Sequence, residues 1–308
     1  MTRGLFVARS SLAIAAATAL LIPFPIEAQR ETRERSIPVS VVTGNDDVPV
    51  TGLTPADFTV REDGVAREVL RVGPAPLPTH LLLLVDDSQV TQPAISYLRP
   101  GLTAFVRKMA DAAQGLAAEA TPQWGLMTFG DRPTKRVDYN QSEIPILRAI
   151  DRIFHQTGAG STLIEALLEA SKELKKKEAA RPLIVAFVDE AGPEFSSRIH
   201  KDVAAALEGA NAGFWVVALQ TGAQNVSSTE SRERAIVTGD VVRWSGGGTK
   251  VVLTPQSLES GFTSLANQIL ARYNVTYGRP ESLVPPSKIE VEVKRRDARV
   301  RAARWWGR

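Results

Sequence analysis

The sequence contains no cysteine. This absence excludes disulfide bonds, thiolate metal sites, cysteine nucleophiles and a lipid anchor attached to a cysteine thiol. The three histidines, His80, His155 and His200, are scattered without the spacing of metal ligands. Walker loops, Gly-x-Ser-x-Gly elbows, His-Glu-x-x-His helices and Gly-x-Gly-x-x-Gly fingerprints are also missing. Because no nucleophile and base stand in a familiar pattern, we expect a protein that is not an enzyme.

Strong net charge is missing as well. The formal net charge is only +3, from 37 lysines and arginines against 34 aspartates and glutamates. Residues 288–308 hold eight basic and three acidic side chains, so the rest of the chain is slightly acidic. We interpret this segment as a solvated strand face, with a patch for an anionic surface as the alternative. The charge pattern therefore predicts no nucleic-acid partner.

The N-terminus has the features of a targeting segment. Arginines precede an alanine-rich apolar run, residues 10–22, and Ile26-Glu27-Ala28 resembles a small-residue cleavage site before Gln29. A membrane-spanning anchor is the alternative, but the run is shorter than the roughly 20 residues that a spanning helix needs. We expect a signal peptide over residues 1–28 and an exported protein that is periplasmic, at the cell surface or secreted. No later stretch could cross a membrane, so we expect no stable membrane insertion after cleavage.

The central region has the pattern of an α/β domain. Leu81–Val85 and Leu183–Val188 are continuous apolar runs, which are typical of strands buried on both faces of a parallel sheet. Segments with strand and helix character alternate from residue 81 to residue 272. This order predicts a doubly wound, mostly parallel, Rossmann-like sheet with helices on both faces.

The flanks have β character. Phe58–Glu62 and Val65–Val72 surround Asp63-Gly64, a pair that favours a tight hairpin turn. Strand character returns near the end of the chain, in residues 273–277, 288–293 and 299–303. Because neither flank is large enough to bury a core alone, we expect the two to form one small β unit. The predicted organisation is a signal peptide (1–28), an N-terminal β segment and linker (29–78), the α/β domain (79–272) and C-terminal strands (273–308).

Acidic and hydroxyl side chains follow the predicted strands. Asp86 and Asp189 end the two apolar runs, Ser88 lies two residues after Asp86, and Thr162 opens a predicted helix. Ligands bind at the carboxyl ends of the strands in sheets of this kind. Oxygen ligands alone favour Mg²⁺ or Mn²⁺ and leave a coordination position open. The alternative is structural: the acids as turn or cap residues, Thr162 with Glu165 as a capping box, and Ser88 as an ordinary loop hydroxyl.

These residues resemble those of the von Willebrand factor type A domain. That family has a metal-ion-dependent adhesion site with the motif Asp-x-Ser-x-Ser, a threonine from a later loop and an aspartate after the fourth strand. Asp86-Asp87-Ser88 is similar to the first part of the motif, Gly160–Leu167 to the threonine loop, and Val188-Asp189 to the last position. The resemblance implies a divalent metal at Asp86, Ser88, Thr162 and Asp189.

The resemblance extends to the flanks. Val48–Gly64 is similar to the leader of a bacterial, exported branch called von Willebrand factor A-related, and the closing strands 273–277 and 288–293 also fit that branch. Val90 departs from the pattern, because it stands where the family places a second serine and offers no oxygen. The resemblance implies a non-enzymatic adhesion-type protein that binds a protein partner through a partly degenerate metal site. A metal-independent interaction or structural scaffold is the alternative, and a hydrolase is a third interpretation.

Overall fold

The computed structural model of the chain describes residues 1–2, 32–222, 228–280 and 284–305. Residues 32–308 form one compact unit. The predicted signal peptide falls almost entirely outside the described residues. No helix in the described ranges is both long and apolar enough to span a bilayer. The domain boundaries proposed from the sequence stay predictions.

A six-stranded sheet forms the centre of the α/β region. Its order is β11-β10-β9-β6-β7-β8, and every neighbouring pair is parallel except β7 and β8. The strands are β6 (His80–Val85), β7 (Gln123–Thr128), β8 (Thr134–Asn140), β9 (Pro182–Asp189), β10 (Gly213–Leu219) and β11 (Thr249–Val252). The predicted α/β class and doubly wound, mostly parallel sheet are confirmed. Strand β8 was not predicted, because its polar, half-exposed edge sequence lacks an apolar run.

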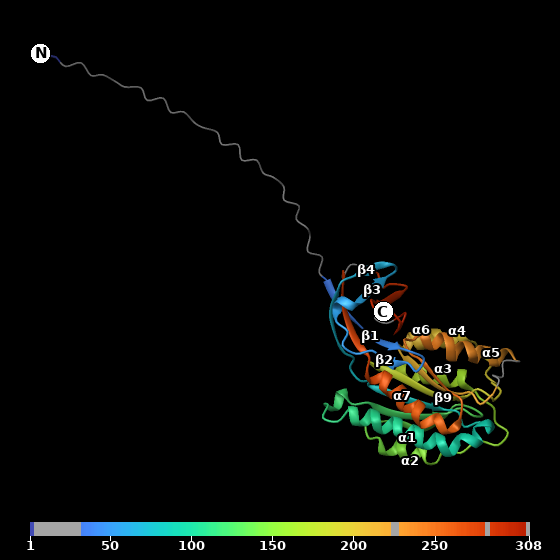
Figure 1. Cartoon of the computed structure of the whole chain (residues 1–308). Helices are drawn as coiled ribbons and strands as arrows, with labels where there is room; N and C mark the ends of the chain where they lie inside the picture. Colours follow the sequence, from blue (N-terminus) through green and yellow to red (C-terminus); the bar gives the residue numbers. More distant parts are fainter. Residues whose placement is uncertain (3–31, 223–227, 281–283, 306–308) are drawn as a thin grey trace. The chain divides into compact units, whose positions relative to one another are not determined.

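Helices cover both faces of this sheet (Figure 1). One face carries α1 (Ile95–Ala112), α2 (Ile144–Ile150) and α7 (Leu258–Leu270). The other carries α3 (Leu163–Lys176), α4 (His200–Ala210), α5 (Thr229–Ile236), a π-helical turn (Val237–Val241) and α6 (Val242–Trp244). Short 3₁₀ segments lie at Pro55–Asp57, Gln89–Ala94, Ala118–Ala120 and Pro255–Ser257.

The central strands are apolar throughout because both of their faces are buried. In β6, Leu81, Leu83 and Val85 pack into the core under α1 and α7. Leu82 and Leu84 point to the opposite core, under α3 and α4. Alternate residues of a strand face opposite sides of a sheet, so a strand between two helical layers needs apolar residues at every position.

The two flanks of the chain pair with each other. One sheet has the order β14-β1-β12-β5, with β2 beside β1, and a second has the order β13-β3-β4. The strands are β1 (Thr32–Thr43), β2 (Val48–Pro49), β3 (Phe58–Glu62), β4 (Val65–Arg67), β5 (Val69–Pro74), β12 (Tyr273–Pro280), β13 (Ile289–Val293) and β14 (Ala298–Ala302). The predicted flanking β unit is therefore confirmed. The predicted hairpin is confirmed in part: its turn at Asp63 (φ 47°) and Gly64 (φ 83°) is left-handed and joins β3 to β4, but Val69 onward leaves the hairpin and pairs with β12 as β5.

Candidate functional site

Two buried aspartates lie at the carboxyl edge of the central sheet. Strands β6 and β9 are parallel neighbours, with Val85 paired to Phe187, so both strands end at the same edge. Asp86 follows β6 and donates its N–H to the Phe187 carbonyl at 3.1 Å, while Asp189 is the last residue of β9. Asp86 is 0% exposed and Asp189 is 3% exposed. The topology therefore places two carboxyl groups side by side and removes both from water.

Hydrogen bonds join Asp86, Ser88 and Asp189. One Asp86 carboxylate oxygen accepts the Ser88 backbone N–H at 3.0 Å, and the other accepts the Asp189 N–H at 3.3 Å. The Ser88 hydroxyl is buried close to Asp86, but within the described part of the chain no partner meets it in hydrogen-bonding geometry. Buried hydroxyls are normally hydrogen-bonded, so an orphan beside two acids marks a place where a ligand can add a contact.

Thr162 lies at the same edge of the sheet. The described part of the structure shows no hydrogen bond between it and Asp86, Ser88 or Asp189. It precedes α3, and its hydroxyl and backbone N–H both donate to the Phe129 carbonyl, at 3.0 and 2.9 Å. Phe129 follows β7 and donates its own N–H to the Val85 carbonyl at 3.1 Å, which ties this loop to the end of β6. The Thr162 hydroxyl thus donates its proton to a backbone carbonyl. The lone pairs of its oxygen remain available to a ligand.

The capping-box alternative for Thr162 is wrong. The Thr162 side chain makes no capping hydrogen bond with the first turn of α3. Glu165 instead accepts the backbone N–H of Ser197 at 2.6 Å and its hydroxyl at 3.3 Å. The Glu165 carboxylate, which the capping-box pattern placed at the start of α3, therefore binds a residue that is distant in the sequence.

Burial governs the protonation of the two acids. It raises the pKa of Asp86, and the nearby Ser88 hydroxyl and the N–H donors from Ser88 and Asp189 offset only part of this effect. Burial also raises the pKa of Asp189 to about 6, and the neighbouring Asp86 charge adds to the rise. Each acid would be stabilised in its charged form by a cation, because the nearby negative charge and the loss of water both oppose ionisation.

A buried arginine on α5 supplies positive charge near the two acids. Arg234 is 3% exposed and lowers the pKa values of both Asp86 and Asp189. One of its terminal nitrogens donates to the Glu190 carbonyl at 3.1 Å, and the other lies 4.0 Å from the Glu194 carboxylate. Sequence reasoning missed Arg234, because its helix is mostly polar and nothing local distinguishes it from a surface arginine.

Glu194 is a further buried acid that the sequence did not reveal. Its carboxylate accepts the hydroxyls of Ser196 and Ser161, the latter at 3.0 Å. Burial raises its pKa to about 7. Ser161 adjoins Thr162, so this pair of hydrogen bonds fixes the threonine loop against the loop that follows β9.

Asp87 holds three loops together beside the site. Its carboxylate accepts the Gly130 N–H at 2.6 Å and the Gln156 side-chain amide at 2.9 Å, and it forms an ion pair with Arg136 at 3.3 Å. Its backbone carbonyl accepts the Gln156 N–H at 2.7 Å. Asp87 is thus a positioning residue, although the sequence pattern treated it as a variable position.

Val90 leaves one position of the expected ligand set without an oxygen. Its Cγ2 lies 2.7 Å from the point where a Cβ on Gly192 would stand, so the valine packs closely against this glycine. The hydroxyl of the next residue, Thr91, donates to the Ser88 carbonyl at 2.8 Å. Water is the group that can fill such a position, since Mg²⁺ usually keeps several waters.

The donors present fit a hard divalent cation. Asp86, Ser88, Thr162 and Asp189 offer only oxygen, two of the groups are carboxylates, and the Ser88 hydroxyl makes no well-formed hydrogen bond among the described residues. No cluster of three or more His, Cys, Asp or Glu side chains placed to hold a metal occurs among the described residues. Any metal here would therefore depend on the two hydroxyls and on water as well as on the carboxylates.

The fold and the residues at this edge are similar to those of type A domains. The family model for the von Willebrand factor type A domain matches residues 81–192. This range contains Asp86, Ser88, Thr162 and Asp189. It also contains the strands from β6 to β9. The family match therefore covers the same part of the chain as the candidate site. Type A domains are protein-interaction and adhesion-type modules.

Solved structures with the same fold include proximal thread matrix protein 1 from the mussel byssus, in a form with a zinc-occupied MIDAS motif. It is 13% identical with a TM-score of 0.50, over 68% of this chain and 49% of that one. The SpRpn10 VWA domain is 16% identical with a TM-score of 0.43, over 60% of this chain and 94% of that one. The PilB minor pilin from Streptococcus sanguinis is 11% identical with a TM-score of 0.45, over 64% of this chain and 62% of that one. This chain spans about half the length of the mussel protein. A comparison with curated protein sequences found no match.

Proposed function

We propose that the chain is an exported, non-enzymatic adhesion-type protein that binds a protein partner through a partly degenerate metal-ion-dependent adhesion site. Asp86, Ser88, Thr162 and Asp189 would hold Mg²⁺ or Mn²⁺. The observation that carries the proposal is the buried Ser88 hydroxyl, which makes no well-formed hydrogen bond within the described residues and lies near Asp86, whose carboxylate accepts the Asp189 backbone N–H at 3.3 Å.

The chemistry of recognition follows from charge. A bound divalent cation would supply an open coordination position for a carboxylate of the partner. The two aspartates hold negative charge at a fixed place, and the Thr162 and Ser88 hydroxyls offer neutral oxygens. Because the acids are buried, their interaction with a cation is less screened than at an exposed site.

Export and membership of the bacterial von Willebrand factor A-related branch belong to the same proposal. The basic and apolar N-terminal segment supports export. The leader over Val48–Gly64 supports the branch, and in the structure this stretch contains β3, which pairs with β13 near the end of the chain. N-terminal sequencing of exported material should begin near Gln29, and a start at Met1 would contradict the cleavage.

The experiment that tests the site is calorimetric titration of Mg²⁺ and Mn²⁺ into chelator-treated protein. We expect saturable binding that Asp189→Ala removes. Asp131→Ala is the matched control, because Asp131 is an exposed acid in the loop after β7 and makes no contact with the site acids that the structure records. Absence of saturable heat at millimolar metal would remove the metal from the proposal.

A metal-independent interaction scaffold is the second candidate. Arg234 favours it, because a buried guanidinium already offsets part of the charge of Asp86 and Asp189. Val90 favours it too, since it removes one oxygen donor. Affinity capture from the native envelope fraction separates the candidates: a partner lost on chelation supports the metal site, and one retained with chelator supports the scaffold. Turnover of generic ester or phosphate substrates would contradict both.

A further inference from the structure

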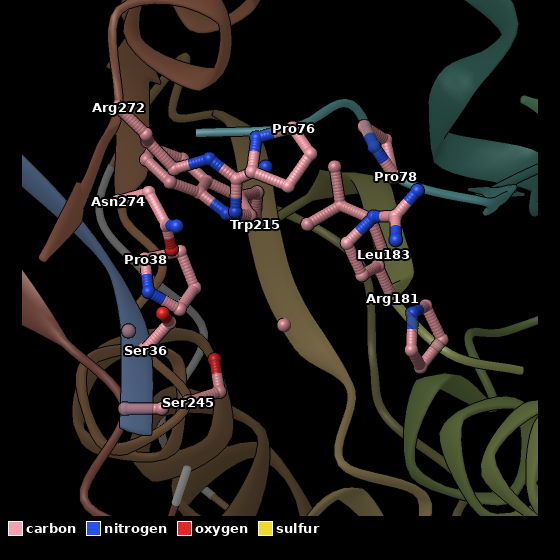
Figure 2. Close-up of a pocket in the computed structure, with 14 residues that line it drawn as sticks. Ser36, Pro38, Pro76, Pro78, Arg181, Leu183, Trp215, Ser245, Arg272 and Asn274 are labelled. Atoms are coloured by element: carbon pink, nitrogen blue, oxygen red, sulfur yellow. The ribbon is translucent and has the colours of Figure 1, made fainter. Parts of the chain in front are cut away.

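A second candidate site lies at the opposite edge of the central sheet. A cavity of about 190 Å³ opens between the starts of β9 and β10 and the β unit (Figure 2). Its walls come from seven separate segments of the chain, which belong both to the central sheet and to the flanking strands. The cavity thus exists only where the α/β region and the flanking strands meet.

Arg272 gives this cavity a fixed positive charge. It follows α7, and its Nε donates to the Ile269 carbonyl at 3.0 Å, which leaves the two terminal nitrogens for other contacts. The Arg272 backbone carbonyl accepts the Ala75 N–H at 2.8 Å, so the residue is held at both its main chain and its side chain. No carboxylate pairs with this guanidinium anywhere in the described ranges, and burial lowers its pKa to about 10.

Arg181 adds a second positive charge to the cavity wall. Its Nε donates to the Leu77 carbonyl at 2.8 Å, again leaving the terminal nitrogens without a recorded protein partner. Figure 2 shows Arg272 with Trp215 on one side of the view and Arg181 with Pro78 on the other. The lining contains no aspartate or glutamate. A partly buried guanidinium without an acid is unfavourable, and an anionic ligand would offset that cost.

The remaining wall is largely apolar. Proline rings, Leu183 and the buried indole of Trp215 surround the charge, and Asn274 adds a side-chain amide with no recorded hydrogen bond. A dry cavity of about 150 Å³ can hold benzene. The cavity beside Arg272 is somewhat larger, which leaves room for one ring and one charged group.

We propose that this cavity binds a small carboxylate with a compact apolar body, with the Arg272 guanidinium holding the carboxylate and the exposed ring of Pro76 and the half-buried ring of Pro38 packing on the body. A guanidinium offers two parallel N–H donors that match the two carboxylate oxygens. Asn274 lies two residues after Arg272 and lines the same cavity, where its amide supplies a further donor. Ligand binding would therefore fasten the flanking strands to the central sheet.

This site is separate from the proposed adhesion site. Leu183 lies near the start of β9 and Asp189 at its end, and six residues of strand span roughly 20 Å. Loss of metal binding at Asp189 would leave the carboxylate site intact. The two proposals can therefore fail independently.

The test uses three probes on the chelator-treated chain: benzoate, benzyl alcohol and acetate. We expect benzoate to bind with a stoichiometry of one and to raise the melting temperature. Its affinity should exceed that of benzyl alcohol, which lacks the charge, and of acetate, which lacks the ring, by about tenfold or more. Equal binding of benzoate and benzyl alcohol, or no saturable benzoate binding, would overturn the proposal.

Two variants locate the binding. Arg272→Met should weaken benzoate binding at least about tenfold, whereas Arg107→Met, which removes an exposed arginine of α1, should leave it unchanged. Asn274→Asp places a carboxylate in the cavity and should weaken benzoate binding by a similar factor. This second variant tests the location even if Arg272→Met fails to fold. Undiminished benzoate binding in a folded Arg272→Met or Asn274→Asp protein would overturn the assignment.

Discussion

The Asp86 carboxylate accepts the backbone N–H of Asp189 at 3.3 Å, across the paired ends of β6 and β9. The two acids are 103 positions apart in the chain, yet the parallel register makes them neighbours. The same contact fixes the backbone of the last residue of β9 relative to the first residue after β6. The two charges therefore act on each other, and the Asp86 charge raises the pKa of Asp189.

Restoring an oxygen at position 90 should strengthen metal binding. Val90→Ser adds a hydroxyl where the resemblance to type A domains places one, and we expect Mg²⁺ affinity to rise about tenfold, equivalent to about 1.4 kcal/mol. Calorimetry of the variant and the parent chain measures this change. Val251→Ser is the control, since Val251 is 45% exposed on β11 and distant in sequence from the site loops. Equal metal affinity in Val90→Ser and the parent would mean that position 90 does not face the ion.

Removing the Asp87 carboxylate should destabilise the site loops. Asp87→Ala leaves the Gly130 N–H and the Gln156 amide without their acceptor, and it leaves Arg136 without its ion pair. We expect the free energy of unfolding to fall by about 3 kcal/mol, as is typical when one partner of a buried charged network is removed. Urea denaturation measures the loss. Asp131→Ala, in the exposed loop that begins at Gly130, should lose far less; a similar loss in both would show that Asp87 has no special structural role.

The sequence predicted the parts of the fold that depend on short-range pattern. Local signals predicted three elements. The apolar runs of β6 and β9 indicate strands that are buried on both faces, and Asp63-Gly64 indicates the tight turn between β3 and β4. Strand β8 had no such signal, because an edge strand buries only one side and carries polar residues.

The candidate site was predictable only in part. Asp86 and Asp189 could be found because each ends an apolar strand, and strand order then places them at one edge. Arg234 and Glu194 could not, because their importance comes from burial by distant segments rather than from their neighbours in sequence. Glu165 shows a different kind of error. Its spacing from Thr162 matches a capping box, but in the folded chain its carboxylate accepts the Ser197 N–H instead.

The buried carboxyl of Glu194 should make stability depend on pH. Its pKa is about 7 in the folded chain against an ordinary 4.5, so the folded state keeps a proton that the unfolded chain has lost between these values. The free energy of unfolding should therefore fall as the pH rises from 4.5 through 7, by an amount on the order of 3 kcal/mol. Urea denaturation across this range, with chelator present, measures the slope.

Glu194→Gln should flatten this slope, because an amide keeps the hydrogen bonds to the serines but does not titrate. Glu169→Gln is the matched control, since Glu169 is exposed on α3 and should leave the slope unchanged. An unchanged slope in Glu194→Gln would assign the pH dependence to another group.

Arg234 should behave as an internal cation that a metal can partly replace. Arg234→Gln removes the positive charge near Asp86, Asp189 and Glu194, so the metal-free variant should lose about 2 kcal/mol of stability at pH 8. At pH 5 the loss should be smaller, because acids with raised pKa values take up protons and no longer need a counter-charge. Added Mg²⁺ should restore part of the loss at pH 8. Thermal unfolding at both pH values measures these effects, with Arg232→Gln, an exposed change on the same helix, as the control. An equal loss at both pH values would mean that Arg234 stabilises the fold through packing rather than through its charge.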